Sequence, residues 1–82
     1  MIKVKSIGYQ TDTIQATVEY DLNNEIYSFT VGATLLQIAA MTIEQIKAYI
    51  VGRVQSERAS KLRALVEERL NGLIDVELED EN

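Results

Sequence analysis

No cysteine, histidine, proline or tryptophan occurs in this chain. Without cysteine it can form no disulfide and has no thiolate metal ligand or thiol nucleophile. Without histidine it lacks the commonest general base and the commonest metal ligand. A phosphate-binding glycine loop and the local signature of a serine nucleophile are missing as well. We therefore expect a protein that is not an enzyme and that needs no cofactor or metal ion.

Long apolar runs are missing too. The first residues, Met1 to Lys5, alternate between apolar and charged and do not form the apolar core of a signal peptide. The most apolar window, residues 34–51, contains Glu44, Lys47 and two glutamines, which is too polar for a membrane span. We expect no membrane association and, since the absence of cysteine fits a reducing compartment, a cytoplasmic protein.

Acids exceed bases, giving a net charge of −5, and the charge is unevenly spread. Residues 44–69 hold six bases and four acids, whereas residues 70–82 hold five acids and no base. A negative chain is a poor general ligand for nucleic acid, because phosphate contacts need a positive surface. The acidic tail also lacks the turn-forming glycine of a calcium loop, so we expect it to protect a sheet edge and aid solubility.

Three segments, residues 2–9, 13–21 and 25–31, predict a three-stranded antiparallel meander. In the middle segment apolar residues alternate strictly with polar ones, which is typical of a half-buried strand. Asn23-Asn24 fits a two-residue turn with positive φ at both positions. That turn sets Tyr20 opposite Tyr27 and places their neighbours of like polarity opposite each other, so turn and pattern agree on the register.

The first turn of the meander fits a three-residue loop over residues 10–12. This loop sets Val4 opposite Val18 and Lys3 opposite Glu19, a favourable cross-strand pair. Carried on to the end of the first strand, the alternation puts Ser6, Gly8 and Ala16 together in a notch on the buried face. It puts the remaining apolar residues on the outer face: Ile7, Tyr9 and Ile26.

Two helices follow the meander. The spacing Thr42…Gln45 is a capping box and opens a long helix over residues 43–71, which Gly72 would end in a left-handed conformation. The same spacing at Thr34…Gln37 predicts a short helix over residues 35–40. A fourth strand within residues 32–41 is the alternative.

The apolar stripe of the long helix turns by roughly 100° near residues 55–60. Either the helix breaks there, or it stays whole and its second half packs on another chain. Beyond it, Ile74, Val76 and Leu78 alternate with acids, which predicts a strand over residues 73–79 that adds to an open sheet edge of its own subunit or of a neighbour. Residues 80–82 should form a frayed acidic tail.

The chain is thus expected to be a single α+β domain spanning residues 1–82. A chain of this length buries only about 60% of its unfolded surface, so self-association is the expected source of further burial. We expect a protein-protein interaction or assembly protein that acts as a homo-oligomer, such as a homodimer. Its interface should comprise four apolar residues of the long helix: Leu62, Leu65, Val66 and Leu70. A small acidic β-meander followed by a long capped helix resembles many short reading frames of bacteria and their phages. This is a resemblance of architecture that implies no function.

An alternative hypothesis assigns the basic helix segment 53–69 to a nucleic-acid-associated regulator. Its contacts would be made by four basic residues: Arg53, Arg58, Lys61 and Arg63. The spacing of these residues also places Glu57 one turn from Arg53 and Lys61, and Glu67 one turn from Arg63. A solvated helix surface that neutralises its own charge is therefore the more economical interpretation.

Overall fold

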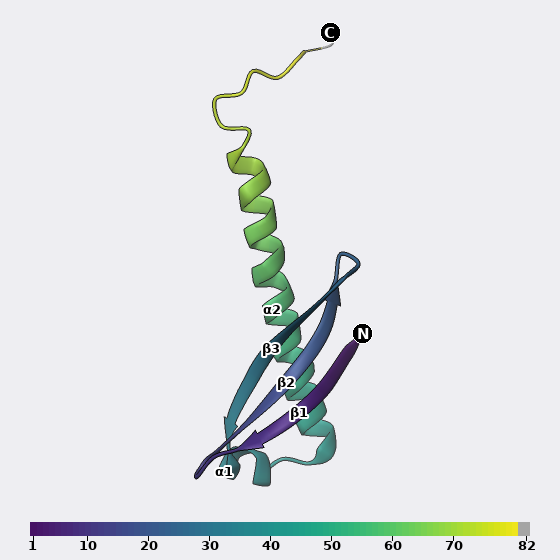
Figure 1. The fold of residues 1–82 in the computed structure, drawn as a ribbon, viewed down its shortest axis with the longest axis vertical. Coiled ribbons are helices and arrows are strands. Elements are labelled where there is room, and N and C mark those ends of the chain that lie inside the picture. The colour runs from purple at the N-terminus through teal and green to yellow at the C-terminus, as the bar shows by residue number, and fades with distance from the viewer. Residues whose placement is uncertain (81–82) are drawn as a thin grey trace.

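The computed structural model describes residues 1–80, which form a three-stranded antiparallel sheet followed by two helices (Figure 1). The strands are β1 (Ile2–Tyr9), β2 (Thr13–Leu22) and β3 (Glu25–Thr34), in the spatial order β1-β2-β3. The helices are α1 (Leu35–Ala39) and α2 (Ile43–Asn71). The predicted α+β fold is confirmed. No separate fourth strand forms within residues 32–41, since the first three of them extend β3 and α1 follows.

The β2–β3 hairpin has the predicted turn and register. Asn23 and Asn24 both have positive φ, at 57° and 68°. Tyr20 lies opposite Tyr27, and the two rings stack with centroids 5.8 Å apart. The two-residue turn therefore fixes which face of each strand is apolar.

A β-bulge interrupts β1. Val4 pairs with Val18 as predicted, but the register shifts between Val4 and Ser6, so that Ile7 lies opposite Ala16. Tyr9 likewise lies opposite Ile14. The extra residue turns Ile7 and Tyr9 to the inner face, so their predicted place on the outer face is wrong, and the notch of Ser6, Gly8 and Ala16 does not form.

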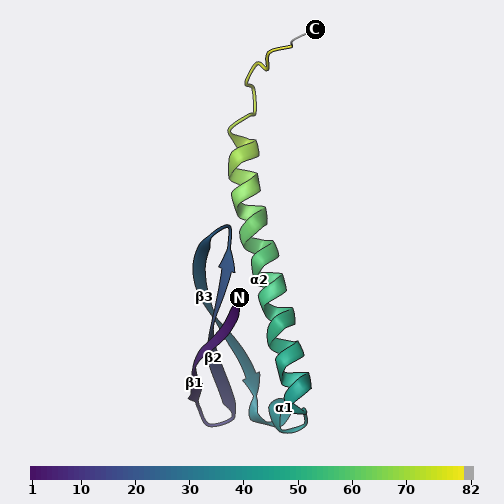
Figure 2. The same ribbon diagram turned by 90° about the vertical axis from the view of Figure 1, so that its right-hand side faces the viewer.

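Helix α2 lies across the inner face of the sheet and then continues past it (Figure 2). The core is small and consists of the following buried side chains: Ala16, Val18, Tyr20, Val31 and Val54. The helix runs unbroken through residues 55–60. Nothing in that segment stops it, because it contains no proline or glycine and Gln55, Glu57 and Arg58 are good helix formers. No helix within residues 1–80 is long and apolar enough to cross a membrane.

Both predicted capping boxes are present. The Thr42 hydroxyl accepts from the Gln45 amide at 3.2 Å, and the Gln45 side chain accepts from the Thr42 amide at 2.8 Å. Thr34 and Gln37 cap α1 in the same way. Gly72, however, has the backbone conformation of a right-handed helix, with φ −66°, so the predicted left-handed cap is wrong. The helix unwinds through further turns instead, and the positive φ falls at Asp75.

The predicted strand over residues 73–79 does not form. Residues 72–75 make turns, and residues 76–80 have no regular secondary structure, Asp80 of the expected tail included; residues 81 and 82 lie outside the described part. The reason is distance, since a 29-residue helix is about 43 Å long and carries this segment away from the sheet. Figure 1 shows the C-terminal end of the chain at the far end of α2 from the sheet.

The molecule is an elongated rod with a small sheet at one end. Its extents are 62 × 22 × 20 Å and its radius of gyration is 18.5 Å, against about 12 Å for a compact chain of this length. Its accessible surface is 6637 Å², whereas a compact monomer of the same mass exposes about 4,900 Å². The part of α2 that extends beyond the sheet and the exposed residues 72–80 contribute to the difference.

Candidate functional site

The first part of α2, residues 43–61, is held to the sheet by specific contacts, and we call it the anchored part. Arg58 donates to the Asp21 carboxylate at 2.8 Å and to the Asp21 carbonyl at 3.0 Å, and its guanidinium lies 5.9 Å from the Tyr20 ring centroid. The Tyr49 hydroxyl donates to the Gly32 carbonyl at 3.2 Å. Together with buried Val54, these contacts fix the helix on β2 and β3.

Two of these groups titrate away from their ordinary range. Burial, and then the neighbouring Glu57 carboxylate, raise the pKa of Tyr20. A hydrogen bond from the N-terminal ammonium is the main cause that lowers the pKa of Asp21, and Arg58 adds to it. The raised pKa of Tyr20 follows from the way the sheet and the anchored part of α2 meet, and the lowered pKa of Asp21 follows mainly from its contact with the N-terminus.

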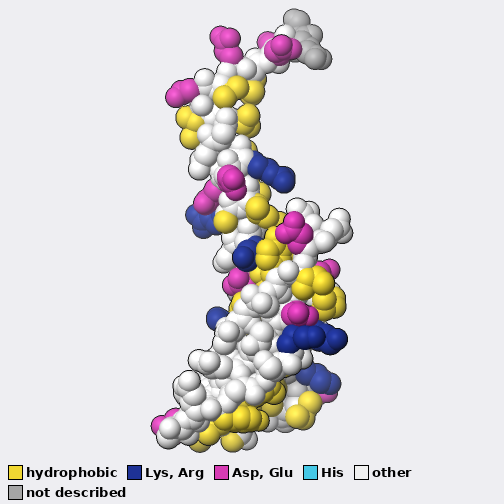
Figure 3. All heavy atoms as spheres, in the orientation of Figure 1, with side chains coloured by type: hydrophobic (Ala, Val, Ile, Leu, Met, Phe, Trp, Pro, Cys, Tyr) yellow, Lys and Arg dark blue, Asp and Glu magenta, His cyan; other side chains and the backbone are white. Residues whose placement is uncertain are grey.

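Residues 62–71, the projecting part of α2, extend beyond the sheet. Of the predicted interface residues, Leu62, Val66 and Leu70 are exposed here, with 45%, 48% and 58% of their surface accessible. They are spaced four residues apart and therefore share one face of the helix. Leu65 is half-buried and lies one turn after Lys61, on the face that continues from Val54 and Arg58. Figure 3 shows hydrophobic side chains on the surface of this part of the rod.

An exposed line of residues runs along α2 from Ala48, to one side of the sheet-facing residues, and reaches Leu73 just beyond the end of the helix. Its positions alternate in spacing between four and three residues, as in a helix that packs against another helix. We call this line the outer stripe: Ala48, Gly52, Gln55, Ala59, Leu62, Val66, Arg69 and Leu73, all exposed. Leu70 flanks it. A side chain built on Gly52 would meet nothing within 4 Å, so contacts within the described chain do not require glycine there.

Most of the predicted nucleic-acid contacts have other partners. Arg58 is bound to Asp21, and Lys61 lies 4.7 Å from the Tyr27 ring centroid. Arg63 donates to Glu67 at 2.8 Å, as predicted from their spacing. The expected pairing of Glu57 with Arg53 and Lys61 is wrong, because the Tyr20 hydroxyl donates to Glu57 and the Tyr27 ring attracts Lys61. Within the described residues Arg53 makes no ion pair, side-chain hydrogen bond or cation–π contact.

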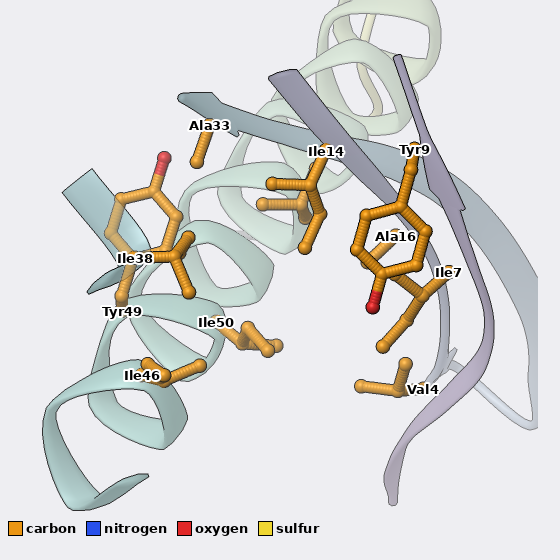
Figure 4. Close-up of a pocket in the computed structure, with 11 residues that line it drawn as sticks. Val4, Ile7, Tyr9, Ile14, Ala16, Ala33, Ile38, Ile46, Tyr49 and Ile50 are labelled. Atoms are coloured by element: carbon orange, nitrogen blue, oxygen red, sulfur yellow. The ribbon is translucent and has the colours of Figure 1, made fainter. Parts of the chain in front are cut away.

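Beside the anchored part of α2 lies an apolar groove of about 260 Å³. The helix covers the inner face of β2 but leaves that of β1 open, so Val4, Ile7 and Tyr9 are 40%, 51% and 72% exposed. In Figure 4 these side chains of β1 face Ile46 and Ile50 of α2 across the groove. The remaining walls come from β2, β3, α1 and α2: Ile14, Ala16, Val31, Ala33, Ile38 and Tyr49.

The groove is a feature that the sequence interpretation missed. Its open wall exists because the bulge in β1 turns Ile7 and Tyr9 inward. A signal was present, since the apolar residues of β1 occur at positions 2 and 4 and then at 7 and 9. That change of phase is what one extra residue in a strand produces.

A third apolar surface follows α2. Ile74, Val76 and Leu78 are exposed by 66%, 50% and 73%. Across residues 1–80, acidic side chains form no group of three that could hold a metal ion. Among the exposed apolar surfaces of the described residues are the outer stripe, the groove and the C-terminal segment.

We compared the chain with protein-family models, with curated proteins and with solved structures, and found no match in any of the three. The physical character of its own surfaces is thus the basis on which a function can be inferred.

Proposed function

We propose that this protein is a non-enzymatic assembly protein that self-associates through the outer stripe of α2. The observation that carries the proposal is the exposure of Leu62, Val66 and Leu70 on one face of a helix that extends beyond its own sheet. The proposed interface keeps Leu62, Val66 and Leu70 from the sequence prediction and leaves out Leu65, which lies on the sheet-facing side of the helix. The nucleic-acid alternative stays a prediction, and no observation favours it.

The amount of exposed surface supports self-association. The chain exposes about 1,700 Å² more than a compact monomer of its mass. A stable interface of standard size removes about 800 Å² from each partner. The excess therefore suffices for such an interface, and a second copy would remove about half of it.

Helix stability gives a second argument. Most helical stability in proteins comes from the packing of an apolar face, and the anchored part of α2 gives the residues beyond it a helix nucleus but no such packing. The projecting part has ten residues, 62–71, and makes no polar or ring contact with the sheet within the described chain. Packing of its apolar face on a second copy would supply the missing stabilisation.

The proposal is tested by solution mass from light scattering, with Leu62→Asp and Val66→Asp beside the unmodified chain. We expect a mass at least twice 9.2 kDa for the unmodified chain at micromolar concentration and 9.2 kDa for both variants. Ala64→Asp is the matched control, because it places the same charge in the projecting part about 200° around the helix from Leu62. A monomeric unmodified chain, or equal dissociation by all three substitutions, would refute self-association through this face.

A further inference from the structure

We propose that two copies pair with their α2 helices antiparallel, so that the segment Leu73–Leu78 of each copy covers the apolar groove beside β1 of the other. This inference rests on the proposed function, since a second copy supplies the segment. It goes further in naming the arrangement of the two chains and the occupant of the groove.

The groove needs a cover that its own chain does not provide. On β2 the inner-face residues Ala16, Val18 and Tyr20 are at most 8% exposed, whereas on β1 the inner-face residues Ile7 and Tyr9 are more than half exposed. β1 is also an edge strand that pairs only with β2 in the described chain, so its second edge is open. The uncovered feature is therefore an apolar surface beside an open strand edge.

The segment Leu73–Leu78 has the matching properties. Its apolar residues Ile74, Val76 and Leu78 alternate with acids, the pattern of a strand with one apolar face. In its own chain it has no strand to pair with, and it lacks regular secondary structure from Val76 onward. An extended segment of this kind can add to an exposed sheet edge and place alternate side chains in an apolar groove.

The segment cannot reach the groove of its own chain. Val76 is five residues beyond the end of α2 at Asn71, a reach of about 17 Å even when fully extended. Ile50, which lines the groove, lies 21 residues before Asn71, about 32 Å back along the helix. In an antiparallel pair, however, the end of one α2 lies beside the start of the other, where the groove is.

Side-chain size along the outer stripe favours the same arrangement. Apart from the polar Gln55 and Arg69, the stripe carries small residues in the anchored part of α2 and large apolar ones in the projecting part. The small residues are Ala48, Gly52 and Ala59, and the large ones are Leu62 and Val66. An antiparallel pair lays the large residues of one helix on the small residues of the other, as close packing of two helices requires. It also accounts for the open space at Gly52.

Charge disfavours the parallel alternative. Residues 70–82 carry five acids and no base, so a parallel pair would hold two such tails side by side. The antiparallel pair instead brings each tail to β1, which carries Lys3 and Lys5 and no acid. It also brings the tail near Lys47, although Lys47 lies 3.4 Å from Glu44 and Lys5 lies 4.0 Å from Glu19 in their own chain. Complementary charge of this kind selects the orientation in which two chains meet.

The natural absence of cysteine makes the arrangement testable by disulfide cross-linking. Val76→Cys and Tyr9→Cys are prepared separately, mixed at micromolar concentration and oxidised, and the cross-linked species are identified by mass. Both side chains are at least half exposed, so neither substitution removes a core residue. Ser28→Cys, exposed on the outer face of the sheet, is the matched control partner for Val76→Cys.

We expect a mixed disulfide between positions 76 and 9 that forms roughly a hundredfold faster than that between positions 76 and 28, because neighbours within a complex meet at about millimolar effective concentration. Val76→Cys alone should form almost none. Fast cross-linking of Val76→Cys with itself would show a parallel pair and overturn the inference. So would equal rates with the two partners in a chain that light scattering shows to be a dimer, a result that leaves the proposed function intact. A monomer by light scattering would overturn both.

Discussion

The two parts of α2 share one continuous backbone but have opposite surroundings. In the anchored part Val54 is fully buried, and Arg58 is fixed by the sheet. In the projecting part Val66, of the same residue type, is about half exposed, and Arg63 pairs with its helical neighbour Glu67. The comparison shows that the length of α2 is set by its caps and by the absence of helix breakers, while the sheet stabilises only its first part.

The largest effect should come from Val54→Ala set against Val66→Ala. Val54→Ala removes buried apolar surface and should lower the free energy of unfolding by about 2 kcal/mol. Val66→Ala should change the free energy of unfolding of the isolated chain by less than about 0.5 kcal/mol, since alanine is the better helix former at an exposed site. Denaturant unfolding at low concentration measures both values.

In self-association the order of the two variants should reverse, with the larger effect from Val66→Ala. Val66→Ala should raise the dissociation constant measured by analytical ultracentrifugation, because Val66 belongs to the outer stripe. A loss of unfolding free energy at low concentration as large as that of Val54→Ala would show that Val66 is packed within its own chain, and the contrast between the two parts would fail.

Arg58→Ala and Arg63→Ala compare two ion pairs, one in each part. Arg58 binds across to β2, and its side chain is 29% exposed, so its loss should cost about 1 kcal/mol of unfolding free energy. Arg63 and Glu67 are 81% and 57% exposed, and such pairs contribute about 0–0.5 kcal/mol. Thermal unfolding would contradict the distinction if both variants lost equal stability.

Gly52→Ala tests the open side of the anchored part. Because nothing lies near Gly52, alanine should raise the free energy of unfolding by up to about 1 kcal/mol through helix propensity alone. The measurement is made in the Val66→Asp background to remove self-association. Ala48→Gly, on the same stripe, should have the opposite sign. Destabilisation by Gly52→Ala in this background would mean that the outer stripe is covered within one chain.

The smallest expected effect is a pH dependence. The pKa of Asp21 is lowered in the folded chain, so its contribution to stability is present above the ordinary value near 3.9 and is lost as the pH falls through the lowered value. The stability difference between the unmodified chain and Asp21→Asn should therefore shrink on acidification below about pH 4. A difference that grows instead would contradict the assigned contact.

Local patterns predicted most of the fold. Asn23-Asn24 determined the hairpin register, and the capping boxes at Thr34 and Thr42 located both helix starts, because each of these signals acts over a few residues. The bulge near Lys5 was missed because strict alternation was carried through β1, although its apolar residues change phase between Val4 and Ile7. The strand predicted for residues 73–79 was wrong for a related reason: the alternation was read correctly, but α2 carries the segment away from every sheet edge of its own chain.

The exposure of the candidate site, though not its role, was predictable in part. Leu62, Val66 and Leu70 were identified because the apolar stripe turns away from the sheet-facing side, which the sequence itself shows. Leu65 was grouped with them because it is apolar, although it lies on the sheet side. The groove could not be predicted without the bulge that turns Ile7 and Tyr9 inward.

Hydrogen exchange of the α2 amides, measured below and above the concentration at which the chain self-associates, tests the central claim most directly. We predict that amides of residues 49–58 are protected at both concentrations, whereas those of residues 62–71 exchange fast in the monomer and become protected on association. Full protection of residues 62–71 in a chain that remains monomeric would contradict the account, because the projecting part would then be stable without a second copy.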